Sequence, residues 1–188
     1  MHNNLSKLIK KVINYIRRYY YLQEFAKINR QRQIVNLSDA KSIGLLYNVL
    51  DEETYHIADA FAKKLKQDNK YVHVLGFIDL KYTQPFIIPT LATDFFIKKD
   101  INWYGKPNNQ FVKDFIERDF DILINLSLND NYTLQYISGL SKAKFKVGTS
   151  NKNNSEFYDF LFELPIHTKL SEYIKQIEYY LTLINKKI

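Results

Sequence analysis

The sequence predicts an α/β fold of three layers, in which a mostly parallel sheet lies between two layers of helices and follows a basic amphipathic N-terminal helix. Three observations lead to this fold class. Short apolar runs alternate with segments of helical spacing, the connections between the runs are long enough to carry crossover helices, and the net charge is concentrated at the start of the chain. We therefore divide the 188 residues into a helical arm, residues 1–35, and an α/β domain, residues 36–188.

Residues 1–35 form a basic arm in front of a neutral domain. The first 33 residues hold eight lysines and arginines and one glutamate, which equals the formal net charge of +7 of the whole chain. At about 100° per residue, the apolar side chains from Leu5 to Tyr20 gather on one side of a helix and the basic side chains on the other. The apolar pattern weakens after Tyr21, so we expect a turn or a change of packing partner near this residue.

Three partners fit a basic amphipathic helix of this kind. It can lie in the interface of an anionic membrane, contact nucleic-acid phosphates, or cover its own domain with its apolar side. The tyrosines at 19–21 and the polar residues at 31–33 continue a pattern of stacking and hydrogen-bonding groups, which favours RNA or a ribonucleoprotein over a membrane. The predicted nucleic-acid-binding residues are Lys7, Lys10, Lys11, Arg17, Arg18, Arg30 and Arg32.

The first half of the domain predicts a strand, a helix and a second strand. The apolar run 42–49 predicts the first strand, and three acidic residues at 51–53 predict the start of a helix, where the helix dipole favours negative charge. The run 71–78 predicts the second strand, which we expect to lie parallel to the first after a right-handed crossover. A short apolar run at 86–88, between two prolines, predicts a third strand.

The second half of the domain repeats this alternation. The segment 121–126 is apolar at its centre, as expected for a strand that helices cover on both faces, and Gly148 closes the strand that follows. The whole succession predicts a Rossmann-like three-layer sandwich. The remaining predicted elements are helices at 108–118 and 130–141, strands at 144–147 and within 157–164, and a C-terminal helix that opens near Ser171.

Two resemblances rest on particular segments of the chain. Residues 93–148 contain DFFIKKDINWYGKP, FVKDFIERDFDILINL and AKFKVG, and with the lysine-rich start they resemble an uncharacterised family, a domain of unknown function, of short bacterial α/β proteins. More distantly, SIGLLYNV, FDILINL and GLSKAKFKVG are similar to the N-terminal half of heptosyltransferase-type glycosyltransferases. The first resemblance implies the α/β fold and a bacterial protein without an established activity, and the second implies a glycosyltransferase-like or nucleotide-binding enzyme.

The predicted ligand site lies outside the carboxyl ends of the strands, near the reversal of strand order, where open parallel sheets bind their ligands. Four polar residues follow or end the predicted strands there. The loop 103–107 adds the single tryptophan of the chain, which either anchors this loop on the core or stacks on a base, a sugar or a peptide beside a lysine that pairs with an anion. The predicted ligand-binding residues are Asn48, Asp79, Trp103, Lys106, Asn125 and Ser127.

The sequence carries no signature of a cofactor, a metal site or a catalytic centre. It has no G-x-G-x-x-G after a strand, no P-loop and no G-x-S-x-G turn, its four histidines are far apart, and it contains no cysteine. We therefore expect no cofactor, no metal ion, no disulfide and no catalytic residue. No apolar run approaches the roughly 18–20 residues of a membrane span, and no signal peptide is apparent, so we expect a cytoplasmic location.

Together these patterns predict a non-catalytic binding or accessory protein whose basic helix docks on RNA or on a ribonucleoprotein surface. Two alternatives remain open. One is a small glycosyltransferase-like or nucleotide-binding enzyme that uses the strand-end cleft, and the other is a protein that attaches peripherally to an anionic membrane surface.

Overall fold

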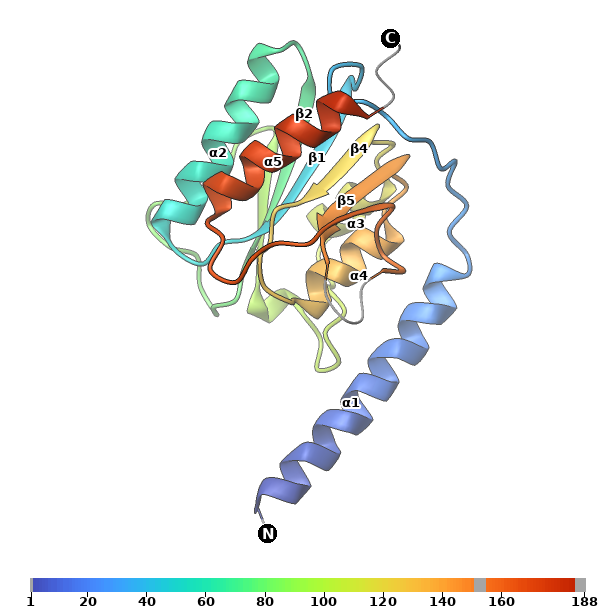
Figure 1. The fold of residues 1–188 in the computed structure, drawn as a ribbon. Coiled ribbons are helices and arrows are strands. Elements are labelled where there is room, and N and C mark those ends of the chain that lie inside the picture. The colour runs from blue at the N-terminus through green and yellow to red at the C-terminus, as the bar shows by residue number, and fades with distance from the viewer. Residues whose placement is uncertain (1, 151–154, 185–188) are drawn as a thin grey trace.

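A computed structural model of the chain describes residues 2–150 and 155–184, and shows a sheet between two helical layers and one long helix outside them (Figure 1). The helices are α1 (His2–Phe25), α2 (Glu52–Gln67), the short 3-10 helix η1 (Lys98–Asp100), α3 (Gln110–Glu117), α4 (Tyr132–Leu140) and α5 (Leu170–Leu183). The strands are β1 (Ser42–Asn48), β2 (Tyr71–Ile78), β3 (Thr93–Ile97), β4 (Ile122–Asn125), β5 (Phe145–Thr149) and β6 (Phe160–Phe162).

The six strands form one sheet in the order β3-β2-β1-β4-β5-β6, and every neighbouring pair is parallel. This arrangement confirms the predicted three-layer α/β fold with its crossover connections. The strand order reverses between β1 and β4, because the chain builds outward from β1 first in one direction and then in the other. The carboxyl ends of these two strands therefore flank the switch point at which such sheets bind ligands.

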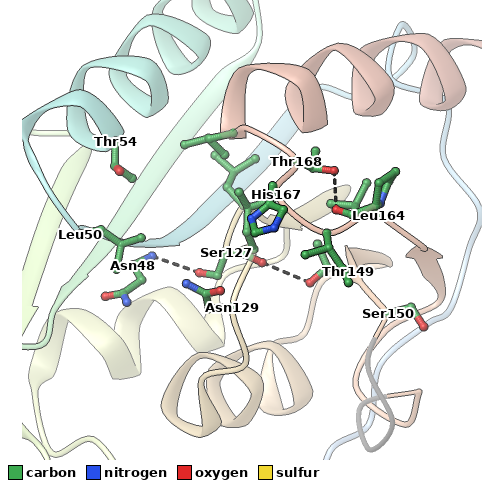
Figure 2. Close-up of a pocket in the computed structure, with 15 residues that line it drawn as sticks. Asn48, Leu50, Thr54, Ser127, Asn129, Thr149, Ser150, Leu164, His167 and Thr168 are labelled. Atoms are coloured by element: carbon green, nitrogen blue, oxygen red, sulfur yellow. Dashed lines mark hydrogen bonds between the residues drawn. The ribbon is translucent and has the colours of Figure 1, made fainter.

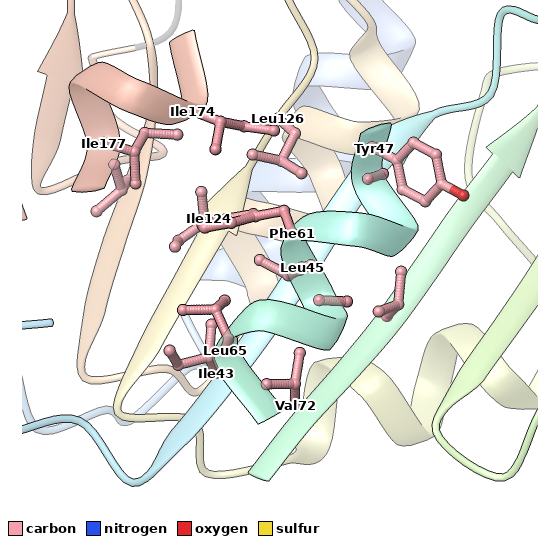
Figure 3. Close-up of a cluster of buried hydrophobic side chains, with 14 of the residues drawn as sticks. Ile43, Leu45, Tyr47, Phe61, Leu65, Val72, Ile124, Leu126, Ile174 and Ile177 are labelled. Atoms are coloured by element: carbon pink, nitrogen blue, oxygen red, sulfur yellow. The ribbon is translucent and has the colours of Figure 1, made fainter. Parts of the chain in front are cut away.

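Alternating side chains on the central strands build one apolar core on each face of the sheet. On β1, Ile43 and Leu45 face the layer of α2 and α5, where they pack beside Phe61 and Ile177 (Figure 3). Leu46 faces the opposite layer, in a second cluster with side chains of α3 and α4. Since both faces are covered, the central strands are buried along nearly their whole length, as their continuous apolar runs require.

The third strand does not lie where the sequence predicts it. Residues 86–88 form a turn and a loop, and the edge strand is β3, Thr93–Ile97. Proline lacks a backbone N–H, so the two prolines that flank 86–88 leave too few donors for a ladder. In β3, Phe95 and Phe96 instead fill the two opposite core clusters, which is the alternation that a strand needs.

The segment that joins α1 to β1 is fixed to the domain by its backbone and side chains. The N–H of Leu37 donates to the carbonyl of Leu181 at 2.9 Å, and the side-chain amide of Asn36 donates to the carbonyls of Thr182 and Ile184 at 2.8 and 2.6 Å. α1 continues past Tyr21 to Phe25, so the change expected near Tyr21 is one of packing partner.

Candidate functional site

A pocket of about 510 Å³ lies at the carboxyl ends of β1, β4 and β5, which we call the strand-end pocket (Figure 2). Asn48 ends β1, Ser127 follows β4, Thr149 ends β5, and His167 belongs to the loop that leads into α5. The pocket therefore occupies the switch point of the sheet, as the sequence predicts for a ligand site. Its volume is in the range of small-molecule sites.

Hydrogen bonds hold most of the polar groups around this pocket. The N–H of Asn48 donates to Ser127 Oγ at 3.1 Å, and Thr149 Oγ1 donates to the carbonyl of Ser127 at 3.2 Å. In contrast, Asn48 Oδ1 is buried and has no hydrogen-bond partner among the described residues. His167 adopts a φ of 72°, in the left-handed region that residues other than glycine rarely occupy. Both features set this pocket apart from an ordinary loop surface.

Uncharged groups line the part of the strand-end pocket that the structure describes. Its described lining contains amides, hydroxyls, aliphatic side chains and the imidazole of His167, but no lysine, arginine, aspartate or glutamate. At the start of α2, the carboxylate of Asp51 accepts hydrogen bonds from the N–H and the hydroxyl of Thr54, at 2.7 and 2.6 Å. These bonds lower the pKa of Asp51 and occupy the helix N-terminus with a negative charge of the protein itself.

Of the four predicted strand-end residues, the structure brings only Asn48 and Ser127 to the pocket lining. Asn125 is buried inside the domain, where its amide donates to Tyr158 Oη at 2.7 Å and its Oδ1 accepts the N–H of Ser127 at 3.0 Å. Asp79 is exposed and pairs with Lys98 at 2.9 Å. Asn125 thus shapes the backbone that carries Ser127, and Asp79 contributes to the surface beyond β2.

The tryptophan loop lies against α1 and not beside the strand-end pocket. Lys106 Nζ pairs with Glu24 of α1 at 2.5 Å, so its positive charge already has an anionic partner within the protein. The ring of Tyr104 stacks on Tyr20 of α1, with centroids 4.9 Å apart. Trp103 packs edge-on against Tyr104 and leaves 66% of its surface exposed, so the indole is available to a partner.

α1 is attached to the domain through Tyr21, which is 1% exposed. Its ring packs against Tyr136 and Phe157, and no Cβ would fit at Gly139 beneath it without displacing the ring. The three successive tyrosines at 19–21 indicate aromatic packing in this region, but the helical wheel does not identify which of the three rings is buried in the domain.

The basic side of α1 is the side that packs on the domain. Arg17 Nε donates to the carbonyl of Tyr104 at 2.8 Å, and its guanidinium lies over the ring of Tyr132. Arg18 pairs with Glu156 at 3.0 Å. Of the two predicted RNA-binding residues, Arg17 therefore helps to hold the helix on the domain, and Arg18, whose side chain is 62% exposed, adds an ion pair at the surface.

The remaining predicted RNA-binding residues divide into bound and exposed groups. Arg30 makes two hydrogen bonds to Asp159, at 2.6 and 2.8 Å, and its side chain is only 8% exposed. Arg32 is exposed and lies 3.9 Å from the same carboxylate. Lys11 is exposed, whereas the side chains of Lys7 and Lys10 lie outside the described part of the structure.

The apolar side of α1 faces away from the domain. We define the outer face of α1 as a set of five exposed residues, whose exposed fractions lie between 43% and 75%. This orientation follows from the attachment through Tyr21 and Arg17, which lie on the opposite side of the helix. The outer face therefore has no partner among the described residues of the domain, apart from the stacked ring of Tyr20. Its members are Ile9, Val12, Tyr15, Tyr19 and Tyr20.

Another buried titratable group, His73 of β2, does not line the strand-end pocket. His73 Nε2 lies 2.8 Å from Asp94 Oδ2, and burial together with the charge of Arg118 lowers the pKa of this histidine. Within residues 2–150 and 155–184, no three histidine, cysteine or acidic residues gather as metal ligands. None of the helices in these ranges has the length and apolar character needed to cross a membrane.

Comparisons with known proteins give one match. The model of a family of unknown function (DUF6913) matches residues 13–184, which include the domain and the half of α1 that packs on it. The search of curated proteins and the search of solved structures each returned no match. The family match agrees with the resemblance to an uncharacterised family, and the glycosyltransferase likeness remains without a relative to support it.

Proposed function

We propose that this chain, which belongs to the family of unknown function matched by residues 13–184, is a binding protein that attaches peripherally to an anionic membrane surface through the outer face of α1. A single observation carries the proposal: the apolar stripe of α1 points away from the protein's own domain. A helix that served only to cover its domain would turn this stripe inward.

The position of the domain agrees with a helix that lies flat in a membrane interface. Tyr21 and Arg17 join the domain to the polar side of α1, opposite the outer face. An interfacial helix buries its apolar side at the boundary of headgroups and acyl chains and leaves its polar side in water. The domain would then lie on the water side of the helix, and the N-terminal half of α1 extends beyond it (Figure 1).

The aromatic residues near the outer face suit the same environment. Tyr15 and Tyr19 are exposed on α1, and Trp103 is exposed in the loop whose Tyr104 stacks on Tyr20. Tyrosine and tryptophan are enriched at membrane interfaces because one part of each ring is apolar and another part hydrogen-bonds to water. Insertion into a membrane interface would explain why Trp103 is exposed, whereas anchoring of its own loop would not.

The charge of the arm favours anionic lipids over neutral ones. The first 33 residues carry the whole net charge of +7, and each of their lysines and arginines that is not paired within the protein would contribute about 1 kcal/mol of attraction near an anionic surface. A cytoplasmic location in a bacterium, as the sequence predicts, would present α1 to the anionic lipids of the inner leaflet. Burial of the outer face in the membrane interface would add about 25 cal/mol of binding free energy for each Å² of apolar surface removed from water.

RNA docking, which the sequence pattern favours, stays a prediction, and the contacts of the arginines weigh against it. Arg17, Arg18 and Arg30 already bind a carbonyl or a carboxylate of the protein, so RNA phosphates would have to compete with these partners. RNA bound on the basic side would also leave the outer face uncovered. A membrane accounts for the apolar outer face, which RNA would leave without a partner.

Co-sedimentation with vesicles tests the proposal. The full chain is mixed with vesicles of phosphatidylcholine alone and with vesicles that contain phosphatidylglycerol. We expect binding to the anionic vesicles, and a loss of about tenfold or more in the variant Val12→Glu/Tyr19→Glu, because two side chains no longer enter the interface and two charges oppose it. Both positions are exposed, so the variant should unfold at nearly the same melting temperature as the unmodified chain.

The matched control places the same charges on exposed apolar residues of the domain, in Leu80→Glu/Leu91→Glu. This control should bind vesicles nearly as well as the unmodified chain. Full vesicle binding by Val12→Glu/Tyr19→Glu would overturn the proposal. So would binding to single-stranded RNA with a steep dependence on salt in a chain that ignores both kinds of vesicle.

A further inference from the structure

The geometry points to a second binding site, independent of α1: the strand-end pocket takes an uncharged ligand with several hydroxyl or amide groups, of the sugar or nucleoside class, and does not recognise a phosphate. Nothing in the attachment of α1 to a surface requires this site. The inference rests on the position of the pocket, on two unusual groups in its lining and on the absence of charge from its described residues.

The pocket lies at the switch point of the sheet, which is where open parallel sheets generally bind their ligands. The chain leaves β1 toward α2 on one face of the sheet and leaves β4 toward α4 on the other face, and Asn48 and Ser127, at these two strand ends, both line the pocket. Side chains of the loop before α5 complete it, so segments that are far apart in the sequence converge on one cavity (Figure 2). A cavity of this size with a few convergent polar groups is the usual form of a small-molecule site.

Two groups in the lining point to a ligand that forms hydrogen bonds. Asn48 Oδ1 is buried and lacks a partner among the described residues, a state that is unfavourable for a polar group. His167 is held at a φ of 72°, a strained conformation of a kind that clusters at binding sites. Figure 2 shows its imidazole among the side chains that line the pocket. A hydroxyl or amide of a ligand would hydrogen-bond to the imidazole of His167, and to Asn48 Oδ1 once this buried side chain turns toward the cavity.

The absence of charged side chains among the described lining residues argues against a phosphate. Sites of this fold that hold nucleotide phosphates use a glycine-rich turn and the free N-terminus of the following helix. Here the turn from Asn48 to Asp51 contains no glycine, and the carboxylate of Asp51 already caps α2 through Thr54. Glu52 and Glu53 add negative charge in the first turn, so a phosphate would meet repulsion where other proteins of this architecture attract it.

The apolar part of the lining narrows the ligand class further. Leu50 and Ile166 are exposed leucine and isoleucine side chains that line the pocket, and Leu128 lies deeper. A pyranose ring and a nucleoside both combine an apolar face with a rim of hydroxyl groups. The two sources share this chemistry, and an experiment with both kinds of probe distinguishes them.

A titration followed by nuclear magnetic resonance tests the site in the full, isotope-labelled chain. The probes are glucose, N-acetylglucosamine, adenosine and uridine at millimolar concentrations, each compared with its monophosphate. We expect saturable shifts that map to the pocket for at least one uncharged probe, and weaker binding of the corresponding phosphate. Shifts with the monosaccharides alone would assign the site to sugars, and shifts with the nucleosides alone would assign it to nucleosides.

A histidine pair supplies the variant and its control. His167→Asn removes the imidazole and keeps a residue that tolerates the left-handed conformation, so it should weaken the binding of the best probe about fivefold, as expected for one lost hydrogen bond. His56→Asn changes an exposed histidine on α2 outside the pocket and should leave binding unchanged. The inference is overturned if no uncharged probe gives saturable shifts at the pocket, or if a monophosphate binds more tightly than its uncharged form.

Discussion

At the scale of single residues, Tyr21 decides how α1 is held. Its ring is buried against Phe157 and Tyr136, yet its hydroxyl has no hydrogen-bond partner among the described residues. The packing of the ring and the isolation of the hydroxyl have opposite consequences for stability. The first is favourable because it removes a large apolar surface from water, and the second is unfavourable because a buried donor loses its water.

Two substitutions at Tyr21 separate these effects. Tyr21→Ala should destabilise the docked helix by about 3–5 kcal/mol, as for other large aromatic residues removed from a core. Tyr21→Phe should change stability by less than about 1 kcal/mol, because it deletes only the unpaired hydroxyl. Limited proteolysis of α1 and thermal unfolding measure both. Equal damage by the two substitutions would show that the hydroxyl, and not the ring, holds the helix.

A second residue-scale feature is Lys146, whose ammonium group is buried in the domain beneath α4. Its Nζ donates to the carbonyl of Gly139 at 2.7 Å. Burial, the largest cause, together with the charges of Arg30 and Arg32 lowers the pKa of Lys146 from 10.5 to about 7, against the opposing effect of Asp159. The folded domain therefore binds a proton at this site less readily than the unfolded chain does.

This shift predicts how stability depends on pH. Between the folded pKa of about 7 and the unfolded pKa of 10.5, the unfolded chain holds more protons at this site, so the free energy of unfolding should rise with pH, by at most about 1.4 kcal/mol per unit. Burial also raises the pKa of Tyr158 and Tyr173, whose opposite effect begins only near pH 10. Denaturant unfolding between about pH 7 and pH 9 measures the lysine alone.

The variant Lys146→Met is the control for this measurement. It keeps the length and apolar stem of the side chain and removes the titrating group, so its free energy of unfolding should be flatter across the same pH range. A rise of equal slope in Lys146→Met would assign the dependence to another group.

At the scale of elements, the connection between α1 and β1 is a structured strap and not a free linker. Arg30 binds Asp159 with two hydrogen bonds, and also donates to the carbonyls of Ala143 and Lys144 at 3.0 and 3.2 Å. Asp159 in turn accepts the N–H of Lys146 at 2.9 Å. These bonds fasten the strap to the start of β5 and to the segment before β6.

Removal of one partner should therefore unfasten the strap. Arg30→Met should lower the free energy of unfolding by about 3 kcal/mol, because it leaves the carboxylate of Asp159 largely buried without its main partner. Arg30→Lys should restore only part of this loss, since an ammonium group cannot reproduce the two parallel hydrogen bonds of the guanidinium. Denaturant unfolding of both variants measures the effect.

The second change in this test concerns the carboxylate. Adding Asp159→Asn to Arg30→Met removes the unpaired charge and should recover part of the lost stability. If Arg30→Met is as stable as the unmodified chain, the ion pair of Arg30 contributes little to folding. Arg30 would then be available to bind RNA.

At the scale of the whole molecule, two surfaces of different character lie on one α/β framework. The outer face of α1 is apolar and aromatic, with basic residues behind it, and the strand-end pocket is small, polar and uncharged in its described lining. Different segments build them, so a substitution such as Val12→Glu should leave the pocket intact. This separation lets each proposal be tested while the other site serves as a measure of correct folding.

The sequence predicts the framework well because the relevant signals are local. The apolar runs of β1, β2 and β4, the acidic start of α2 and the long connections between strands are each contained in short segments, and the structure confirms the parallel sheet that they predict. The misplaced third strand has a local cause too. An apolar run between two prolines satisfies composition but lacks the backbone donors of a strand.

The position of the strand-end residues shows where local reasoning ends. Asn48 and Ser127 reach the predicted pocket because the carboxyl ends of adjacent parallel strands meet there. Asn125 ends β4 as well, yet its side chain enters the domain and binds Tyr158, and His167 enters the pocket from a loop that carries no sequence signal. The pleat of β4 decides where the Asn125 side chain points, and the path of the loop before α5 decides where His167 lies. Both depend on packing with residues that are distant in the sequence.

The sequence by itself determines that α1 is a helix with an apolar and a basic side, because the helical period follows from backbone geometry alone. Only the tertiary structure decides which side meets the domain. That choice depends on contacts between α1 and residues more than eighty positions away, such as Arg17 with Tyr104 and Glu24 with Lys106. A helical wheel does not include these contacts, and they turn the apolar side of α1 away from the domain.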